Sequence, residues 1–342
     1  MISQITIKNA LSMGLPIIDV RSPGEFEKGH IPDANHLPLF SNDERAHIGT
    51  VYKQQSKEVA IDIGYEYVRP KLKKFISKAL LLAPKGEVIV HCWRGGMRSR
   101  SFAKLLSDNG FSDVKVIIGG YKSYRNYVLY SLALPVRLCV LGGYTGSGKT
   151  QILKRLKHIE NQVIDLEKLA NHQGSAFGGI GKGKQPSVEQ FENNLHFELN
   201  KLDLNRIIWV EDESHNIGKV KIPIQFFEQM RNANLFFVDI PKEERAKYLV
   251  TEYAGCNKQL LADSVLRISK RLGDLNTKNA IKYLEKDNFY EVALLSLQYY
   301  DKFYLKGMKK RESTQVIQIQ IQTVDPLENA LKIEKLTLKC KI

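Results

Sequence analysis

The stretch Val136-Arg-Leu-Cys-Val-Leu-Gly-Gly-Tyr-Thr-Gly-Ser-Gly-Lys-Thr150 joins an apolar run to a glycine-rich turn. Its last eight residues satisfy the pattern G-x-x-x-x-G-K-S/T, and residues 151–157 after it have the apolar spacing of a helix. A strand, such a turn and a helix in this order let backbone N–H groups converge on an anion at the positive end of the helix. The stretch therefore predicts a P-loop for a di- or triphosphate group, though not that the group is hydrolysed.

The P-loop pattern indicates which residues hold the phosphates. Glycines let the backbone approach the anion, Lys149 would contact the terminal phosphates, and the Thr150 hydroxyl could bind Mg²⁺. Acidic residues at the ends of two later predicted strands are candidates for holding that ion, although such residues are often only a solvated strand end. The predicted phosphate ligands are Gly143, Gly146, Gly148, Lys149 and Thr150, and the acidic candidates are Asp165, Glu211 and Asp212, the last two within the cluster Glu211-Asp-Glu213.

Short β-rich runs alternate with helical stretches along most of the chain, which predicts α/β units with parallel sheets. The alternation of predicted strands and helices begins again near residue 135, so we expect two domains, 1–134 and 135–342. From about residue 241 the second domain turns helical, and an alternating run then predicts one more strand. The predicted strands are 15–20, 87–91, 115–118, 136–141, 162–165, 206–210, 234–239 and 315–321, and the helices predicted in the first domain are 70–82 and 99–109.

The composition is that of a soluble globular protein. The 342 residues are 43% hydrophobic and 26% charged, which argues against a disordered chain. No apolar run reaches the ~20 residues of a membrane span, and the N-terminus lacks the pattern of a secretory signal. The four cysteines lie far apart, so neither a disulfide framework nor a zinc site is expected. These features predict a cytoplasmic protein without membrane contact.

The formal net charge of +14 favours partners that carry many negative charges. The excess divides into +7 for residues 1–134 and +7 for the remainder, so it is not a detachable basic tail. A lysine-rich solvated surface would give the same charge. The charge alone leaves both interpretations open.

A second loop, His91-Cys-Trp-Arg-Gly-Gly-Met-Arg-Ser99, follows a predicted strand and leads into a helix. Cys92 is thereby placed at a helix N-terminus, inside a turn of backbone amides and close to Arg94 and Arg98. Each of these features favours the thiolate, so Cys92 is predicted to be a nucleophile and the two arginines to serve the same site. Cys139 and Cys256, by contrast, are better interpreted as small buried core residues.

The form of this loop is shared by two kinds of enzyme. His-Cys-x-x-Gly-x-x-Arg-Ser matches the signature of tyrosine and dual-specificity phosphatases, in which the cysteine attacks phosphorus. The same cradle serves sulfurtransferases of the rhodanese type, and residues 19–38, DVRSPGEFEKGHIPDANHLP, resemble the N-terminal rhodanese signature almost position by position. Many sulfurtransferases of this fold have six residues in the loop, whereas residues 92–98 make seven. The larger cradle suits phosphate or selenophosphate and keeps open a cysteine-dependent phosphatase with a nucleotide-binding domain.

The two halves together resemble the bacterial tRNA 2-selenouridine synthase family, also described as tRNA 2-selenouridine/geranyl-2-thiouridine synthases. The resemblance implies a rhodanese-like α/β domain followed by a P-loop NTPase-like α/β domain with a helical C-terminal extension. It covers residues from about 19 to beyond 253 in the family's order and spacing. The segments that carry it are 42–49, 52–55, 94–99, 119–122, 142–150, 174–178, 191–192 and 211–214, with looser similarity at 268–273 and 300–304.

The resemblance implies a selenotransferase with geranyltransferase activity that acts on tRNA. In this family 2-thiouridine at the wobble position of the anticodon is first geranylated with geranyl diphosphate. Selenophosphate then delivers selenium and the thiogeranyl group leaves, giving 2-selenouridine. Cys92 falls on the family's essential cysteine, which would carry selenium, with the phosphate of selenophosphate held against Arg94 and Arg98.

Several further expectations follow from the resemblance. No cofactor would be tightly bound, Mg²⁺ is a candidate ion, and the P-loop would hold the diphosphate of geranyl diphosphate. The need for selenophosphate suggests contact with the enzyme that produces it. A non-catalytic RNA-binding or sulfur-carrier adaptor is disfavoured because both anion cradles are intact.

Binding of tRNA requires basic residues that contact its phosphates. Any single basic residue is more often a solvated surface charge, so these residues are candidates only. We expect packing between helices for Tyr299, Tyr300 and Tyr304. Stacking on an unpaired RNA base is the alternative. The candidates for tRNA binding are Lys182, Lys184, Arg245 and Arg271, together with Lys242, Lys247, Lys270 and the basic cluster 306–311.

Overall fold

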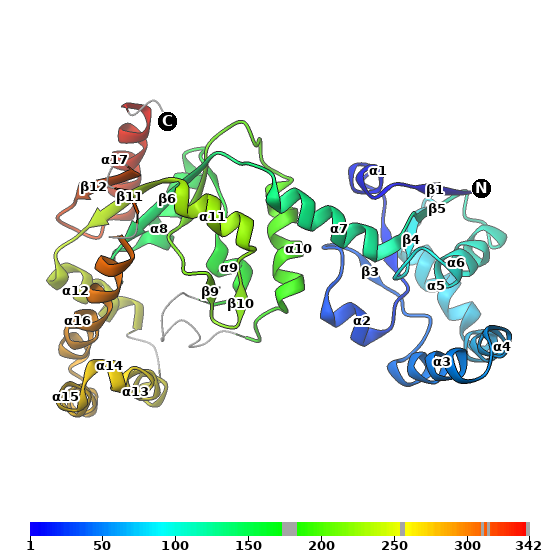
Figure 1. The fold of residues 1–342 in the computed structure, drawn as a ribbon, viewed down its shortest axis with the longest axis horizontal. Helices are drawn as coiled ribbons and strands as arrows, with labels where there is room; N and C mark the ends of the chain where they lie inside the picture. The colour runs from blue at the N-terminus through cyan, green and yellow to red at the C-terminus, as the bar shows by residue number, and fades with distance from the viewer. Residues whose placement is uncertain (173–182, 254–256, 309–310, 313–314, 340–342) are drawn as a thin grey trace. The chain divides into compact units, whose positions relative to one another are not determined.

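The computed structural model describes residues 1–172, 183–253, 257–308, 311–312 and 315–339, and it divides into two compact units (Figure 1). Unit 1 comprises residues 1–131 with 192–194, and unit 2 comprises 132–191 with 195–342. Each unit is built on a five-stranded parallel sheet, so the predicted α/β fold class is confirmed. Within the described part of the chain, no helix combines the length and the apolar character needed to cross a membrane.

The sheet of unit 1 has the strand order β1-β5-β4-β2-β3, and every neighbouring pair is parallel. Parallel strands require crossover connections, and helices between the strands supply them. The register places Asp19 at the end of β2 opposite His91 at the end of β4. The strands are β1 (Ile2–Ile5), β2 (Ile17–Asp19), β3 (Asn35–His36), β4 (Glu87–His91) and β5 (Asp113–Ile117).

The helices of unit 1 cover this sheet and close its core. Phe75 and Phe102 come from two of these helices and meet edge to face, with 5.8 Å between ring centroids, above the buried strand residues 88–90. The helices are α1 (Ile7–Ser12), α2 (Pro23–Lys28), α3 (Asn42–Gln54), α4 (Lys57–Val68), α5 (Leu72–Leu82), α6 (Met97–Asp108) and α7 (Gly120–Ala133). A 3₁₀ turn, Arg69–Lys71, joins α4 to α5.

A buried ion pair between Asp19 and Arg21 lies at the end of β2. Asp19 and Arg21 have no solvent exposure, and the Arg21 guanidinium donates to the Asp19 carboxylate at 2.6 Å and to the Gly29 carbonyl at 2.8 Å. Burial acts to raise the pKa of Asp19, but the nearby His91 and the hydrogen bonds from Arg21 outweigh it and lower that pKa. The aspartate and arginine that open the 19–38 signature therefore have a structural role.

The sheet of unit 2 has the order β12-β11-β6-β8-β7, again with every neighbouring pair parallel. Its central strand β6 is fully buried and leads directly into the glycine-rich turn. The strands are β6 (Leu138–Gly143), β7 (Gln162–Val163), β8 (Ile208–Glu211), β11 (Asn234–Asp239) and β12 (Val316–Gln320), and a small antiparallel hairpin pairs β9 (Asn216–Ile217) with β10 (Val220–Lys221).

The helical part of unit 2 is inserted before the last strand. The chain leaves β11, forms helices α12–α16, and returns to add β12 at the sheet edge and α17 against α8. The helices α13 to α16 share an apolar core of their own. The helices of unit 2 are α8 (Lys149–His158), α9 (Leu166–Ala170), α10 (Val188–Leu199), α11 (Ile224–Asn232), α12 (Lys242–Tyr253), α13 (Lys258–Arg267), α14 (Ser269–Leu272), α15 (Asp274–Glu285), α16 (Phe289–Met308) and α17 (Pro326–Lys339).

The buried ion pair predicts a large stability effect. Arg21→Met should lower the free energy of unfolding of unit 1 by about 3–5 kcal/mol, because it leaves the Asp19 charge buried without its partner. The matched change Lys104→Met removes an exposed pair with Asp108 and should cost less than about 1 kcal/mol. Denaturation followed by Trp93 fluorescence in a Trp209→Phe background measures both, and equal losses would contradict the assignment.

Candidate functional site

The first candidate site is the loop between β4 and α6. Cys92 lies at its base with 3% of its surface exposed, and its Sγ is 3.2 Å from the Ser99 hydroxyl oxygen. The four backbone amides of residues 93–96 donate no hydrogen bond to any described residue. Amides at the start of α6 also have no partner within the helix. Cys92 therefore lies beside a set of free donors that suits an anion.

Two glycines let this loop fold tightly against the turn that follows β5. Gly95 has φ +63°, and a Cβ there would come within 2.4 Å of the Ile117 carbonyl oxygen. Gly120 has φ +56°, and its Cβ would lie 2.3 Å from the Cys92 carbonyl oxygen. A side chain at either position would force the backbone apart. The shape of the loop is therefore fixed by its glycines.

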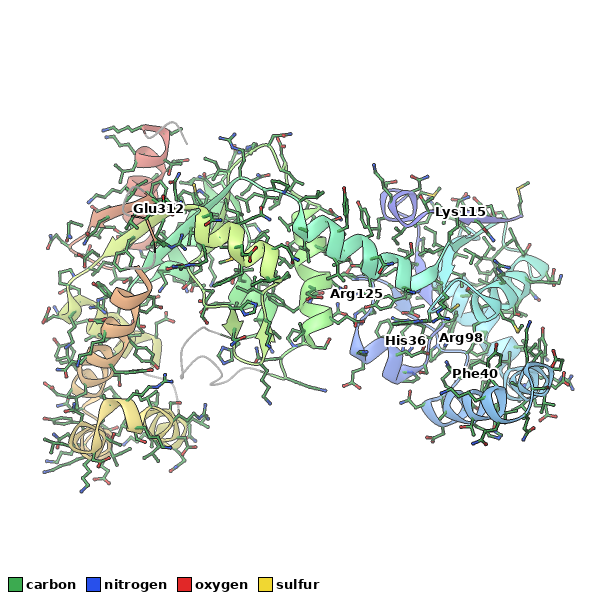
Figure 2. The ribbon with its side chains drawn as sticks, in the orientation of Figure 1. His36, Phe40, Arg98, Lys115, Arg125 and Glu312 are labelled. Carbon is green, nitrogen blue, oxygen red and sulfur yellow. The ribbon has the colours of Figure 1, made fainter. Side chains whose placement is uncertain are left out.

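Arg98 is held by a carboxylate that the sequence did not point to. Arg98 is labelled in Figure 2. Its guanidinium donates to the Glu25 carboxylate from both terminal nitrogens, at 2.7 and 3.2 Å. Burial acts to raise the pKa of Glu25, but the hydrogen bonds and charge of Arg98 outweigh it and lower the pKa. Arg94, the other predicted arginine, is exposed. The structure thus places both arginines on the loop, with Arg98 already paired.

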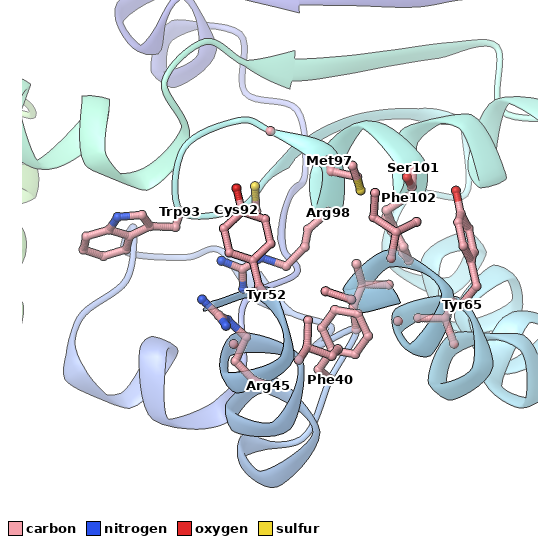
Figure 3. Close-up of a pocket in the computed structure, with 18 of the residues that line it drawn as sticks. Phe40, Arg45, Tyr52, Tyr65, Cys92, Trp93, Met97, Arg98, Ser101 and Phe102 are labelled. Atoms are coloured by element: carbon pink, nitrogen blue, oxygen red, sulfur yellow. The ribbon is translucent and has the colours of Figure 1, made fainter. Parts of the chain in front are cut away.

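A wide pocket of about 1410 Å³ adjoins Cys92 (Figure 3). Its walls come from α3, α4, the loop and the length of α6, all within unit 1. Arg45 and Arg98 lie near the cysteine, while Phe40 and Phe102 line the deeper part. The loop therefore opens onto a space large enough for a substrate.

The second candidate site is the P-loop between β6 and α8. The Lys149 side chain is buried, with Nζ 3.4 Å from the Glu211 carboxylate and 5.3 Å from the centre of the Tyr304 ring. Burial acts to lower the pKa of Lys149, but Tyr304 and the neighbouring carboxylates raise it overall. Lys149 is therefore a firmly held cation at the base of the loop.

Three buried carboxylates face this lysine. Glu167, Glu211 and Glu213 can each direct an oxygen to within 4.8 Å of the others, and the Thr150 hydroxyl lies 3.1 Å from Glu167 and 3.2 Å from Glu211. Burial raises the pKa of Glu211 to about 7, because the charge of Lys149 offsets only part of the penalty. Carboxylate and hydroxyl oxygens are the donors that Mg²⁺ prefers, so these residues fit that ion.

The predicted acidic residues are only partly those of this cluster. Glu211 belongs to it, whereas Asp165 caps α9 by accepting a hydrogen bond from the Lys168 amide at 2.8 Å. Asp212 points elsewhere and pairs with Arg311 at 2.9 Å. Glu213 lies just after the end of β8, where its amide donates to the Glu211 carbonyl oxygen at 2.8 Å, and this turn brings Glu213 into the cluster with Glu211.

Family models match both halves of the chain. Residues 4–127 match the rhodanese-like domain, and residues 136–332 match the description "tRNA 2-selenouridine synthase AAA domain". The chain belongs to the tRNA 2-selenouridine synthase family.

Individual relatives in the family agree with this match. A protein of Nitrosomonas eutropha named tRNA 2-selenouridine synthase is 33% identical, covering 87% of this chain and 89% of its own length. One of Bdellovibrio bacteriovorus with the same name is 32% identical over 90% of this chain and 93% of its own length. The relative from Nitrosomonas europaea is 40% identical, and the alignment covers 70% of this chain and 63% of that protein.

The residues predicted to bind tRNA lie in different environments. Lys182 lies outside the described residues, as does the motif 174–178, while Lys184 is exposed. Arg271 is exposed and donates to the Tyr299 hydroxyl at 2.8 Å. These observations leave Lys184 and Arg271 as predictions.

Two other basic candidates have structural roles, which corrects the prediction. Arg245 is 2% exposed and donates to the carbonyl oxygens of Ile240 and Thr145 and to the Asp301 carboxylate. It therefore braces the P-loop at Thr145. Arg311 is buried, and its guanidinium binds carbonyl oxygens at the end of α11, those of Met230, Arg231 and Ala233.

The raised pKa of Glu211 predicts how stability depends on pH. Between about pH 4.5 and 7 the folded protein keeps a proton that the unfolded chain has lost, so stability should fall as the pH rises through this window. Glu211→Gln should make that fall shallower and raise the melting temperature of unit 2 at pH 8. Thermal unfolding from pH 5 to 8 without divalent cations measures this, with the exposed Glu198→Gln as control. A wild-type slope in Glu211→Gln would contradict the argument.

Proposed function

We propose that this protein is a tRNA-modifying transferase that converts wobble 2-thiouridine into 2-selenouridine through an S-geranyl intermediate. Family membership supports an enzyme of this kind. The observation that carries the proposal is the presence of two anion cradles, the Cys92 loop and the P-loop, in one chain. Two phosphate-bearing substrates, selenophosphate and geranyl diphosphate, match them.

The P-loop suits the first stage. The sulfur at C2 of 2-thiouridine attacks C1 of the geranyl group, so that an S–C bond forms, the C–O bond to diphosphate breaks, and the N3 proton passes to solvent. Negative charge develops on the departing diphosphate, where the loop amides and Lys149 would stabilise it. A magnesium ion at Thr150 and Glu211 would neutralise further charge. This role accounts for a P-loop in a reaction that needs no nucleotide hydrolysis.

The Cys92 loop suits the second stage. Overall, S-geranyl-2-thiouridine, selenophosphate and water give 2-selenouridine, geranylthiol and phosphate, so no net oxidation or reduction takes place. A thioether sulfur leaves C2 more readily than a thiocarbonyl sulfur, which gives the geranyl group a chemical purpose. The free amides beside Cys92 would bind the phosphate oxygens of selenophosphate, with exposed Arg94 and paired Arg98 at the rim.

Removing the P-loop lysine should stop the first stage. Lys149→Ala should reduce geranyl transfer from geranyl diphosphate to a 2-thiouridine RNA by about 10²–10³-fold, the cost of one lost transition-state donor. Lys154→Ala, on the exposed side of α8, is the matched control. Mass spectrometry of the RNA nucleosides gives the rates. Geranylation at the normal rate in Lys149→Ala would refute the assignment of the P-loop.

Replacing the cysteine should separate the two stages. With Cys92→Ser, selenation should fall about 10³-fold or more while S-geranyl-2-thiouridine accumulates, because the nucleophile is absent only from the second site. Cys139→Ala, in the core of unit 2, should still form 2-selenouridine. Loss of both stages in Cys92→Ser would show that the sites are not separable.

The seven-residue loop also favours a second candidate, a cysteine-dependent phosphatase. An artificial aryl phosphate tests it directly, since a phosphatase would hydrolyse such a compound rapidly and only with Cys92 present. We expect no Cys92-dependent turnover. Rapid turnover, together with no change in tRNA nucleosides on deletion of the gene, would favour the phosphatase over the transferase.

A further inference from the structure

We propose that the pocket beside Cys92 binds the prenyl chain of the S-geranyl intermediate while selenium replaces the sulfur. The inference rests on the proposed function, which supplies that intermediate. It adds a binding site for the leaving group, distinct from the P-loop that holds the diphosphate in the first stage.

The pocket has the place and the size for this role. Cys92, Trp93, Arg94, Met97 and Arg98 line one wall, so the cavity opens directly at the anion cradle (Figure 3). Its volume of about 1410 Å³ exceeds the ~300–1,000 Å³ of ordinary ligand pockets. A nucleotide and a ten-carbon chain could therefore occupy it together.

The opposite wall is apolar although it faces solvent. Tyr52 on α3 and Tyr65 on α4 line the pocket with 59% and 53% of their surfaces exposed. Below them lie the half-buried Ile61 and the nearly buried Phe40. Clustered apolar side chains at a catalytic cysteine indicate an apolar ligand, because covering them gains about 25 cal/mol for each Å² removed from water.

The rim of the pocket is strongly basic. Seven basic side chains but only two acidic ones line the cavity. Lys53, Lys57, Arg69 and Arg94 are exposed among them. Such a rim complements a polyanion. Unmodified RNA would contact only the basic rim, and a lipid chain would contact only the apolar wall. An RNA base that carries a prenyl thioether would contact both.

Binding the chain would also direct the substitution. The chain is attached to the sulfur that leaves, so anchoring it in the apolar wall fixes C2 beside the Cys92 loop. As the selenium of selenophosphate forms its bond to C2, the C2–S bond breaks and the electron pair goes to the sulfur, while hydrolysis of the Se–P bond releases phosphate. The geranylthiolate is already in an apolar site, where it takes a proton on release. The pocket thus selects the alkylated substrate and receives the leaving group.

Binding measurements with anticodon stem–loop RNAs test the inference. The RNAs carry S-geranyl-2-thiouridine or S-methyl-2-thiouridine, and the proteins are wild type, the double variant Tyr52→Ser/Tyr65→Ser, and the control Tyr130→Ser. Tyr130 is an exposed tyrosine of α7 that does not line the pocket. Wild type and Tyr130→Ser should bind the S-geranyl RNA at least tenfold more tightly than the S-methyl RNA. The double variant should lose most of that preference while retaining its affinity for the S-methyl RNA, because its charge is unchanged, and its melting temperature.

The outcomes separate this inference from the proposed function. If wild type neither binds S-geranyl RNA preferentially nor converts it with selenophosphate, the proposed function fails and the inference with it. If wild type converts S-geranyl RNA but the double variant keeps the full preference and rate, the function stands and the pocket assignment is overturned. An equal loss in Tyr130→Ser would also overturn it.

Discussion

Both candidate sites depend on one constraint, the unpaired amides at the start of a helix that follows a parallel strand. A helix leaves its first N–H groups without partners, and a short turn from a buried strand aims them at one point. β4, residues 92–96 and α6 form one such unit, and β6, the P-loop and α8 form the other. Glycine is required in both turns, at Gly95 because of the Ile117 carbonyl and at Gly148 because of its φ of +69° and the nearby Val324.

In each site the principal cation already forms an ion pair with a carboxylate of the protein. Glu25 holds Arg98 in unit 1, and Glu211 holds Lys149 in unit 2. A phosphate-bearing substrate offers the same oxygen chemistry with more charge, so it can replace the carboxylate or share the cation with it. The internal partners keep the cations in place and lower the cost of burying them. Both cradles are therefore organised before a substrate arrives.

The sequence predicted what local patterns encode. The predicted strands and the two loops appear where expected, because apolar runs and glycine-rich turns act over short distances, whereas β1, β3 and the hairpin β9–β10 were not predicted. Glu25 was missed because it pairs with Arg98 across 73 residues. Arg245 was misjudged because two of its partners, the Thr145 carbonyl and the Asp301 carboxylate, lie 100 and 56 residues away along the chain. Among the carboxylates, the cluster 211–213 was recognised, but the turn after β8 that brings Glu213 and not Asp212 to Glu211 is not encoded in a local pattern.

The adjacency of an anion cradle and an apolar wall at Cys92 gives the fold a reason for its seven-residue loop. A phosphate-sized cradle by itself would admit many small anions, and an apolar wall by itself would admit many lipids. Under the proposed function, selection would arise because both must be filled at once, with the reacting carbon between them. α3 and α4, which carry Tyr52 and Tyr65, lie between the 19–38 signature and the Cys92 loop along the chain. The helices that build the apolar wall would then adapt this rhodanese-like unit to the prenylated substrate that we propose.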